Sequence, residues 1–125
     1  MIPRHRVVSL YPWFKIHPGK LDAFKALLPR FIANAAKEPA CLFYDFTLNG
    51  DLLHCREAYV GAEGVLVHLQ NVGPLLAEAF QLADVVQLEL HGAADELAKL
   101  REPLKDMPAA WFTLEAALDQ PAPGA

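Results

Sequence analysis

An Asn49-Gly50 pair between two strand-like runs is the feature that most constrains the fold of this chain. Cys41 to Leu48 and Leu52 to Val60 are rich in β-branched and aromatic residues, and Asn-Gly is the strongest short-range signal for a hairpin. A two-residue turn at this pair places Tyr44 opposite Cys55. Cys41 and Cys55 then point to opposite faces of the sheet, so no disulfide is expected. One face of the predicted hairpin carries Leu42, Tyr44, Phe46, Leu53, Cys55, Glu57 and Tyr59.

The segment before the hairpin predicts a strand followed by a helix. Val7 to Ile16 reads as a strand, and Pro12 within it predicts a bulge or an unpaired side, because proline cannot donate to a ladder. Apolar residues then recur at spacings of three and four from Leu21 to Ala35, which is typical of an amphipathic helix. Pro29 is expected to kink this helix.

The segment after the hairpin predicts shorter elements. A helix is expected over 62–71, a break at Gly73-Pro74, and a second helical piece over 75–83. In the strand predicted over 85–91, Val86, Leu88 and Leu90 share one side. A helix over 93–101, a strand over 111–116 and a flexible tail over 119–125 complete the chain.

This order of elements predicts an α+β fold. It matches a ferredoxin-like βαββαβ unit with an antiparallel sheet, extended by a C-terminal helix and a short strand, in a single domain over 1–118. Helices would cover one face of the sheet, and a second copy of the chain is the simplest cover for the other. A 54% apolar fraction in 125 residues also favours a homodimer, because a small domain buries a lower share of its surface.

Charge and motifs exclude several classes of function. A formal charge of −4 argues against a nucleic-acid partner, and no apolar run approaches the ~20 residues of a membrane span. The N-terminus lacks the pattern of a signal peptide, so a cytoplasmic location is expected. The five histidines are scattered without metal-ligand spacing. No metal site is therefore predicted. The chain also has no Gly-rich phosphate loop or Walker-type motif, and no cofactor is predicted.

Four stretches together resemble the antibiotic biosynthesis monooxygenase (ABM) domain family over roughly residues 7 to 92. They are the turn at 17–20 with its helix, Glu38-Pro39-Ala40-Cys41 with the aromatic strand after it, Glu57-Ala58-Tyr59, and the run from His68 to Asn71. The resemblance implies a homodimeric α+β barrel with a cavity between sheet and helices in each subunit. It also implies oxidation of quinols by oxygen without flavin, metal or haem.

The chain departs from the family pattern at three points. Ala40 stands where glycine is frequent, and Tyr59 stands where tryptophan is common. The haem-degrading branch uses an asparagine on the first strand, and this strand contains none, so haem degradation is not expected.

Two residues are predicted to be catalytic. His68 would take a proton from a phenol or quinol hydroxyl, since the pKa of an imidazole lies near working pH. With Leu66 taken as the middle of the buried stripe, the helical step places His68 at the edge of that stripe, within reach of a cavity mouth. Glu57, a carboxyl on an otherwise apolar face, would orient His68 or bind a substrate hydroxyl. The predicted substrate-binding residues are Trp13, Tyr44, Tyr59, Tyr11 and Phe46, which would stack against a flat ring.

Three functions remain open from the sequence. The first is a cofactor-independent monooxygenase for a small reduced aromatic substrate such as a quinol or an anthrone. The second is a non-catalytic dimeric module that binds a small hydrophobic metabolite. A proton-transferring isomerase or cyclase is the third.

Overall fold

The computed structural model describes residues 2–119, and the predicted flexible tail lies outside them apart from Asp119. The elements in chain order are η1 (Arg4–Arg6), β1 (Val7–Ile16), α1 (Leu21–Ala35), β2 (Cys41–Asn49), β3 (Leu52–Val60), α2 (Gly61–Leu82), β4 (Ala83–Gly92), α3 (Ala94–Ala98) and β5 (Ala109–Thr113).

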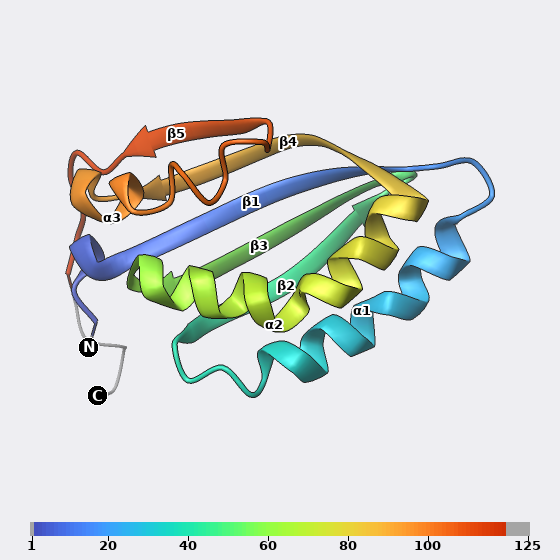
Figure 1. Ribbon diagram of the computed structural model, residues 1–125, viewed down its shortest axis with the longest axis horizontal. Helices are drawn as coiled ribbons and strands as arrows, with labels where there is room; N and C mark the ends of the chain where they lie inside the picture. The colour runs from blue at the N-terminus through green and yellow to red at the C-terminus, as the bar shows by residue number, and fades with distance from the viewer. Residues whose placement is uncertain (1, 120–125) are drawn as a thin grey trace.

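The sheet has the order β2-β3-β1-β4-β5, and its first four strands pair antiparallel in the ferredoxin-like arrangement. This confirms the α+β prediction. The short C-terminal strand β5 is added at the edge of this sheet and runs parallel to β4. The chain returns through α3 and a series of turns before it enters β5, so both strands run in one direction (Figure 1).

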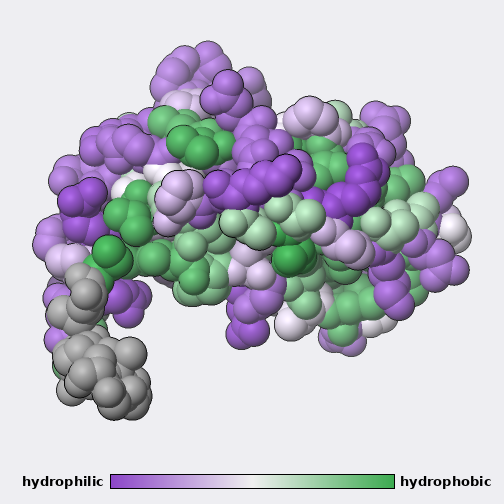
Figure 2. Space-filling model, turned by 90° about the horizontal axis from the view of Figure 1, so that it is seen from below, coloured by the Kyte–Doolittle hydropathy of each residue, from purple (hydrophilic) through white to green (hydrophobic). Residues whose placement is uncertain are grey.

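Helices α1 and α2 lie side by side over one face of the sheet (Figure 1). Two apolar clusters fill the space beneath the helices, one around Leu90 and Leu100 and one around Phe24 and Leu53. Figure 2 shows the molecule from below, on the side of α1 and α2, where apolar and hydrophilic side chains are interleaved. No described element covers the opposite face of the sheet.

The hairpin forms as predicted, but its register differs by two residues. Asn49 lies opposite Leu52, so the turn is Gly50-Asp51, and Gly50 has φ +63°. A glycine with positive φ at the first turn position is typical of a type II′ turn. Tyr44 therefore faces Glu57 instead of Cys55. A shift of two residues leaves each side chain on its predicted face, because side chains alternate with a period of two.

Two register shifts redirect side chains that the simple alternation misplaced. The β1–β4 ladder has a bulge between Trp13 and Phe14, one residue beyond Pro12, where the sequence predicted a bulge or an unpaired side. As a result Val85 instead of Val86 packs against the core. Val86 is 54% exposed. A second shift near the start of β2 leaves Leu42 exposed, although the sequence predicted it on the inner face.

The predicted break at Gly73-Pro74 was wrong, because α2 is one continuous helix. Its ribbon bends part-way along (Figure 1). Pro74 removes one hydrogen bond to the preceding turn. The buried stripe nevertheless continues across it, with Val65 and Val72 before the proline and Leu75 and Ala79 after it. Packing of this stripe against the sheet offsets the lost bond.

Candidate functional site

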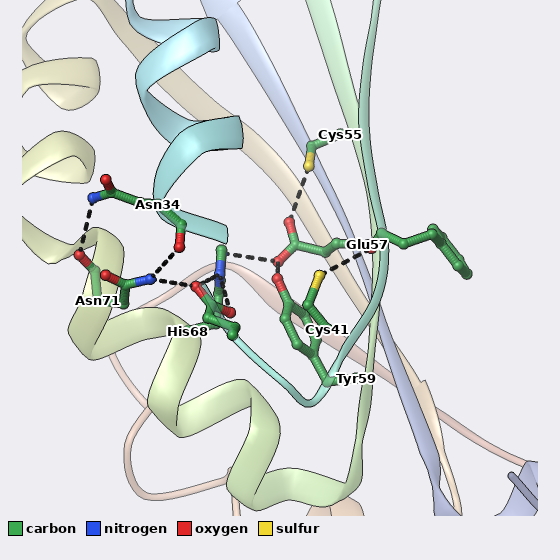
Figure 3. Close-up of polar contacts among 9 residues, drawn as sticks. Asn34, Cys41, Cys55, Glu57, Tyr59, His68 and Asn71 are labelled. Atoms are coloured by element: carbon green, nitrogen blue, oxygen red, sulfur yellow. Dashed lines mark hydrogen bonds and ion pairs between the residues drawn. The ribbon is translucent and has the colours of Figure 1, made fainter. Parts of the chain in front are cut away.

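His68 lies at the centre of the buried face of α2, between Val65 and Val72. The prediction that it flanks this face was wrong, because Leu66, taken as the middle of the stripe, is exposed. His68 does line a cavity, as the sequence predicted. His68 itself is only 2% exposed. Figure 3 shows its ring between Asn34 and Asn71 on one side and Glu57, Cys55 and Tyr59 on the other.

The two ring nitrogens of His68 face two different carboxyl groups. Nδ1 lies 3.0 Å from both carboxyl oxygens of Glu38. Nε2 lies 3.5 Å from Oε1 of Glu57. All three side chains are almost fully buried. A carboxylate accepts, so the Glu38 contact assigns the hydrogen to Nδ1 and leaves Nε2 free to accept a proton.

Glu38 is positioned by the tight turn that joins α1 to β2. Its backbone N–H donates to the carbonyl of Ala35, and its carbonyl accepts from the N–H of Cys41. Asn71, one turn beyond His68, donates through Nδ2 to Oε2 of Glu38 at 2.6 Å and to the carbonyl of Asn34 at 2.8 Å. This amide therefore ties α1, α2 and the Glu38 carboxyl together.

Glu57 is held by its neighbours on the same face of β3. The thiol of Cys55 donates to Oε2 at 3.0 Å, and the hydroxyl of Tyr59 donates to Oε1 at 2.9 Å. Burial raises the pKa of Glu57, and the charge of His68 opposes that rise. Burial also raises the pKa of Cys55 and of Tyr59, so both stay neutral donors. The site thus places a carboxyl group with a raised pKa beside the second ring nitrogen of His68.

A cavity of about 220 Å³ opens beside these groups. Its polar end is formed by His68, Glu57, Cys55 and Tyr44, and its remaining walls are aliphatic and phenylalanine side chains from the sheet, α1 and α2. This volume lies at or below the ~300–1,000 Å³ of common ligand pockets. The shape therefore suits a small, mostly apolar molecule with one polar end.

The C-terminal extension contributes to this cavity. Pro103, Leu104 and Met107, from the turns between α3 and β5, form part of its wall. Leu104 also packs into the core cluster around Leu90. The extension therefore closes one side of the cavity and adds the edge strand.

The structure separates the predicted substrate-binding residues into three groups. Tyr44 and Phe46 line the cavity. Tyr59 is fully buried, and its hydroxyl donates to Glu57, but it does not line the cavity. Tyr11 and Trp13 project from the opposite face of the sheet, because Leu10, Pro12 and Phe14 are the β1 residues that face the cavity.

On that opposite face Trp13 stacks on His54, with ring centroids 3.6 Å apart. Trp13 and Tyr11 do not line the cavity. The prediction that they bind the substrate there was wrong, because it assigned them to the wrong face of the strand.

Glu38 and Asn71 are the site residues that sequence reasoning missed. Both stood in the stretches that carry the ABM resemblance, and Asn71 follows His68 by three residues, which places them on one helix face. Among the described residues, no group of three His, Cys, Asp or Glu side chains has the arrangement of a metal site. None of the helices within residues 2–119 combines the length and apolarity that crossing a bilayer requires.

No protein-family model and no curated protein matches this chain. Solved structures do. MupZ from Pseudomonas fluorescens is 45% identical, with a TM-score of 0.89, over 96% of this chain and 99% of MupZ. The chain belongs to the same family as MupZ. The likeness to MupZ spans the C-terminal extension as well as the βαββαβ core, since it covers nearly all of both chains.

More distant neighbours of this MupZ-family protein share the ABM-domain fold. A Caulobacter crescentus protein assigned as an antibiotic biosynthesis monooxygenase is 18% identical, with a TM-score of 0.63, over 70% of this chain and 89% of its own. A mutant of SnoaB, a cofactor-independent oxygenase from Streptomyces nogalater, is 15% identical, with a TM-score of 0.61, over 71% of this chain and 94% of its own. These likenesses confirm the ABM fold.

Proposed function

We propose that this protein is an enzyme that performs acid–base chemistry on a small, mostly apolar substrate. The reaction we infer is a cofactor-independent monooxygenation of a reduced aromatic such as a quinol or an anthrone. The observation that carries the proposal is the buried Glu38–His68–Glu57 chain at the polar end of an apolar cavity. The ABM fold, shared with the oxygenase SnoaB, supports the oxidative part.

The residues divide the work between them. Tyr44, Phe46 and the apolar walls exclude water and position the ring. Nε2 of His68 takes a proton from a hydroxyl or an activated carbon, while Glu38 stabilises the resulting imidazolium. Oxygen then accepts electrons from the substrate anion. One oxygen atom enters the product, and the other leaves as water.

A second function is favoured by the raised pKa of Glu57. A carboxylic acid and an imidazole base within one cavity are also the equipment of an isomerase or a cyclase, in which the acid gives a proton to one atom of the substrate and the base removes one from another. Such a reaction consumes no oxygen and leaves the mass of the substrate unchanged.

The test is a turnover assay on quinols and anthrones without added metal or flavin, run under ¹⁸O₂. An oxygenase consumes oxygen and yields product that carries ¹⁸O. His68→Asn keeps the contact with Glu38 but removes Nε2, so it should lower kcat by about 10²-fold or more. His91→Asn, a half-exposed histidine outside the cavity, is the matched control.

Other outcomes decide between the remaining functions. A product of unchanged mass, formed without oxygen uptake, would replace the oxygenase with the isomerase or cyclase. Saturable binding of an apolar ligand without any product would favour the non-catalytic module. A His91→Asn loss equal to that of His68→Asn would mean that the effect is not specific to the proposed site.

A further inference from the structure

A second pocket lies beside Glu38, and His68 is not among its lining residues. It has a volume of about 240 Å³ and is lined by Ile32, Ala35, Ala36, Glu38, Cys41 and Tyr44. Ile32 and Ala36 are exposed, so this pocket opens at the surface beside the end of α1. We refer to it as the side pocket, and to the cavity next to Glu57 as the main cavity.

Glu38 is the one carboxyl group that lines the side pocket, while Glu57 and His68 line the main cavity. Tyr44 lines both, with its ring at 70° to that of His68 and the centroids 5.0 Å apart. Tyr44 therefore forms a partition between the two spaces. Burial raises its pKa, so its hydroxyl stays neutral and does not compete with Glu38 for a proton.

The two ring nitrogens of His68 thus connect two compartments. Nε2 serves the main cavity, and Nδ1 contacts the carboxyl of Glu38, a residue that lines the side pocket. We infer that Glu38 and the side pocket form a proton channel, which lets His68 exchange protons with solvent while the main cavity stays closed around its substrate. This inference rests on the proposed acid–base function and adds a route and a residue to it.

The transfer balances in three steps. Nε2 of His68 takes a proton from the substrate, which leaves a substrate anion and an imidazolium. Nδ1 then gives its own proton to the Glu38 carboxylate along the 3.0 Å contact. Glu38 passes that proton to water in the side pocket. The same path in reverse returns a proton to Nδ1 as Nε2 gives its proton to the product, so the ring stays neutral.

Separation of the two compartments has a chemical purpose. An electron-rich substrate anion in a dry cavity is protected from solvent protons, and interactions with the residues around it are stronger than they would be in water. A base that had to reach solvent through the same cavity would admit water at each turnover. Asn71, which does not line the side pocket, stabilises the arrangement because it donates to Oε2 of Glu38.

The channel is tested by the exchange of the His68 Nδ1 proton with water, followed by NMR on protein labelled with ¹⁵N-histidine. Ala36→Phe fills the side pocket from an exposed position. Exchange then has to wait for local opening and should slow by about tenfold or more. Ala33→Phe, on the same helix but outside the pocket, should leave the rate unchanged. Met107→Phe, which fills the main cavity, should also leave it unchanged.

The channel would be overturned if Met107→Phe slowed the exchange and Ala36→Phe left its rate unchanged. Equal exchange rates in wild type and all variants would also overturn it. Ile32→Trp narrows the side pocket from a second exposed position and replaces Ala36→Phe if that variant does not fold. His68→Asn identifies the signal, because it removes that one ring. The measurement needs no substrate, so a failed channel is distinguishable from a failed oxygenase.

Discussion

Replacing Glu57 with glutamine should make the stability of the protein less sensitive to rising pH. Glu57 is buried, and burial raises the pKa of its carboxyl above the ordinary 4.5. The folded protein therefore holds this proton more tightly than the unfolded chain does. The resulting stability is complete below pH 4.5 and is lost as the pH rises from there to the pKa of the folded state.

The magnitude follows from one proton. Within that window wild type should lose about 1.4 kcal/mol of unfolding free energy for each pH unit, relative to Glu57→Gln. Above the folded-state pKa the difference should become constant. Because Nε2 of His68 lies 3.5 Å from Glu57, the upper limit of the window belongs to the pair.

The assay is urea unfolding of both proteins from pH 4 to pH 8, with the difference in free energy plotted against pH. Glu63→Gln is the control, because Glu63 is exposed and a backbone hydrogen bond and Lys99 lower its pKa. Its contribution is lost only as the pH falls below 4.5, so its difference should stay nearly constant over most of this range. A wild type that gains stability over Glu57→Gln with rising pH would refute the raised pKa of Glu57.

Three further predictions concern the frame around the site. Asn71→Ala removes the 2.6 Å donor to Glu38 and should cost about 1.5–3 kcal/mol in urea unfolding; an unchanged midpoint would contradict that contact's importance. Gly61→Ala should lower the free energy of unfolding by about 1–2 kcal/mol, because Gly61 has φ +71°. Gly73→Ala should raise it by about 0.5–1 kcal/mol, because Gly73 lies inside α2 with open space around it. Equal effects of the two substitutions on stability would contradict this interpretation. We also expect a homodimer through the uncovered sheet face in sedimentation, weakened by Val86→Asp on an exposed residue; a wild-type monomer at micromolar concentration would exclude it.

The order of the elements was predictable because the signals behind it are local. The helix over Leu21–Ala35 follows from apolar spacing along one turn of chain after another, and the hairpin follows from a glycine that accepts positive φ. These properties depend on neighbours within a few residues. The fold class, and the face on which Tyr44, Phe46 and Glu57 lie, followed from them.

The predictions that were wrong concern features that depend on residues distant in the chain. The bulge that turns Val86 outward arises where β4 meets β1, and the continuity of α2 across Pro74 arises from packing against the sheet. Tyr11 and Trp13 share the composition of a binding site, yet strand alternation alone does not say which face of a sheet the helices will cover.

His68 and Glu57 stood out in the sequence because a histidine and a carboxyl among apolar residues need a reason. The arrangement of the groups around His68 could not be predicted from the sequence. Glu38 lies in a turn 30 residues before His68 and reaches it only when α1 packs on α2. Sequence alone therefore determined the elements, their order and two of the chemical groups. Tertiary packing decided the burial that raises the pKa of Glu57, the carboxyl on each side of His68 and the two separate pockets, because each needs surfaces from several elements at once.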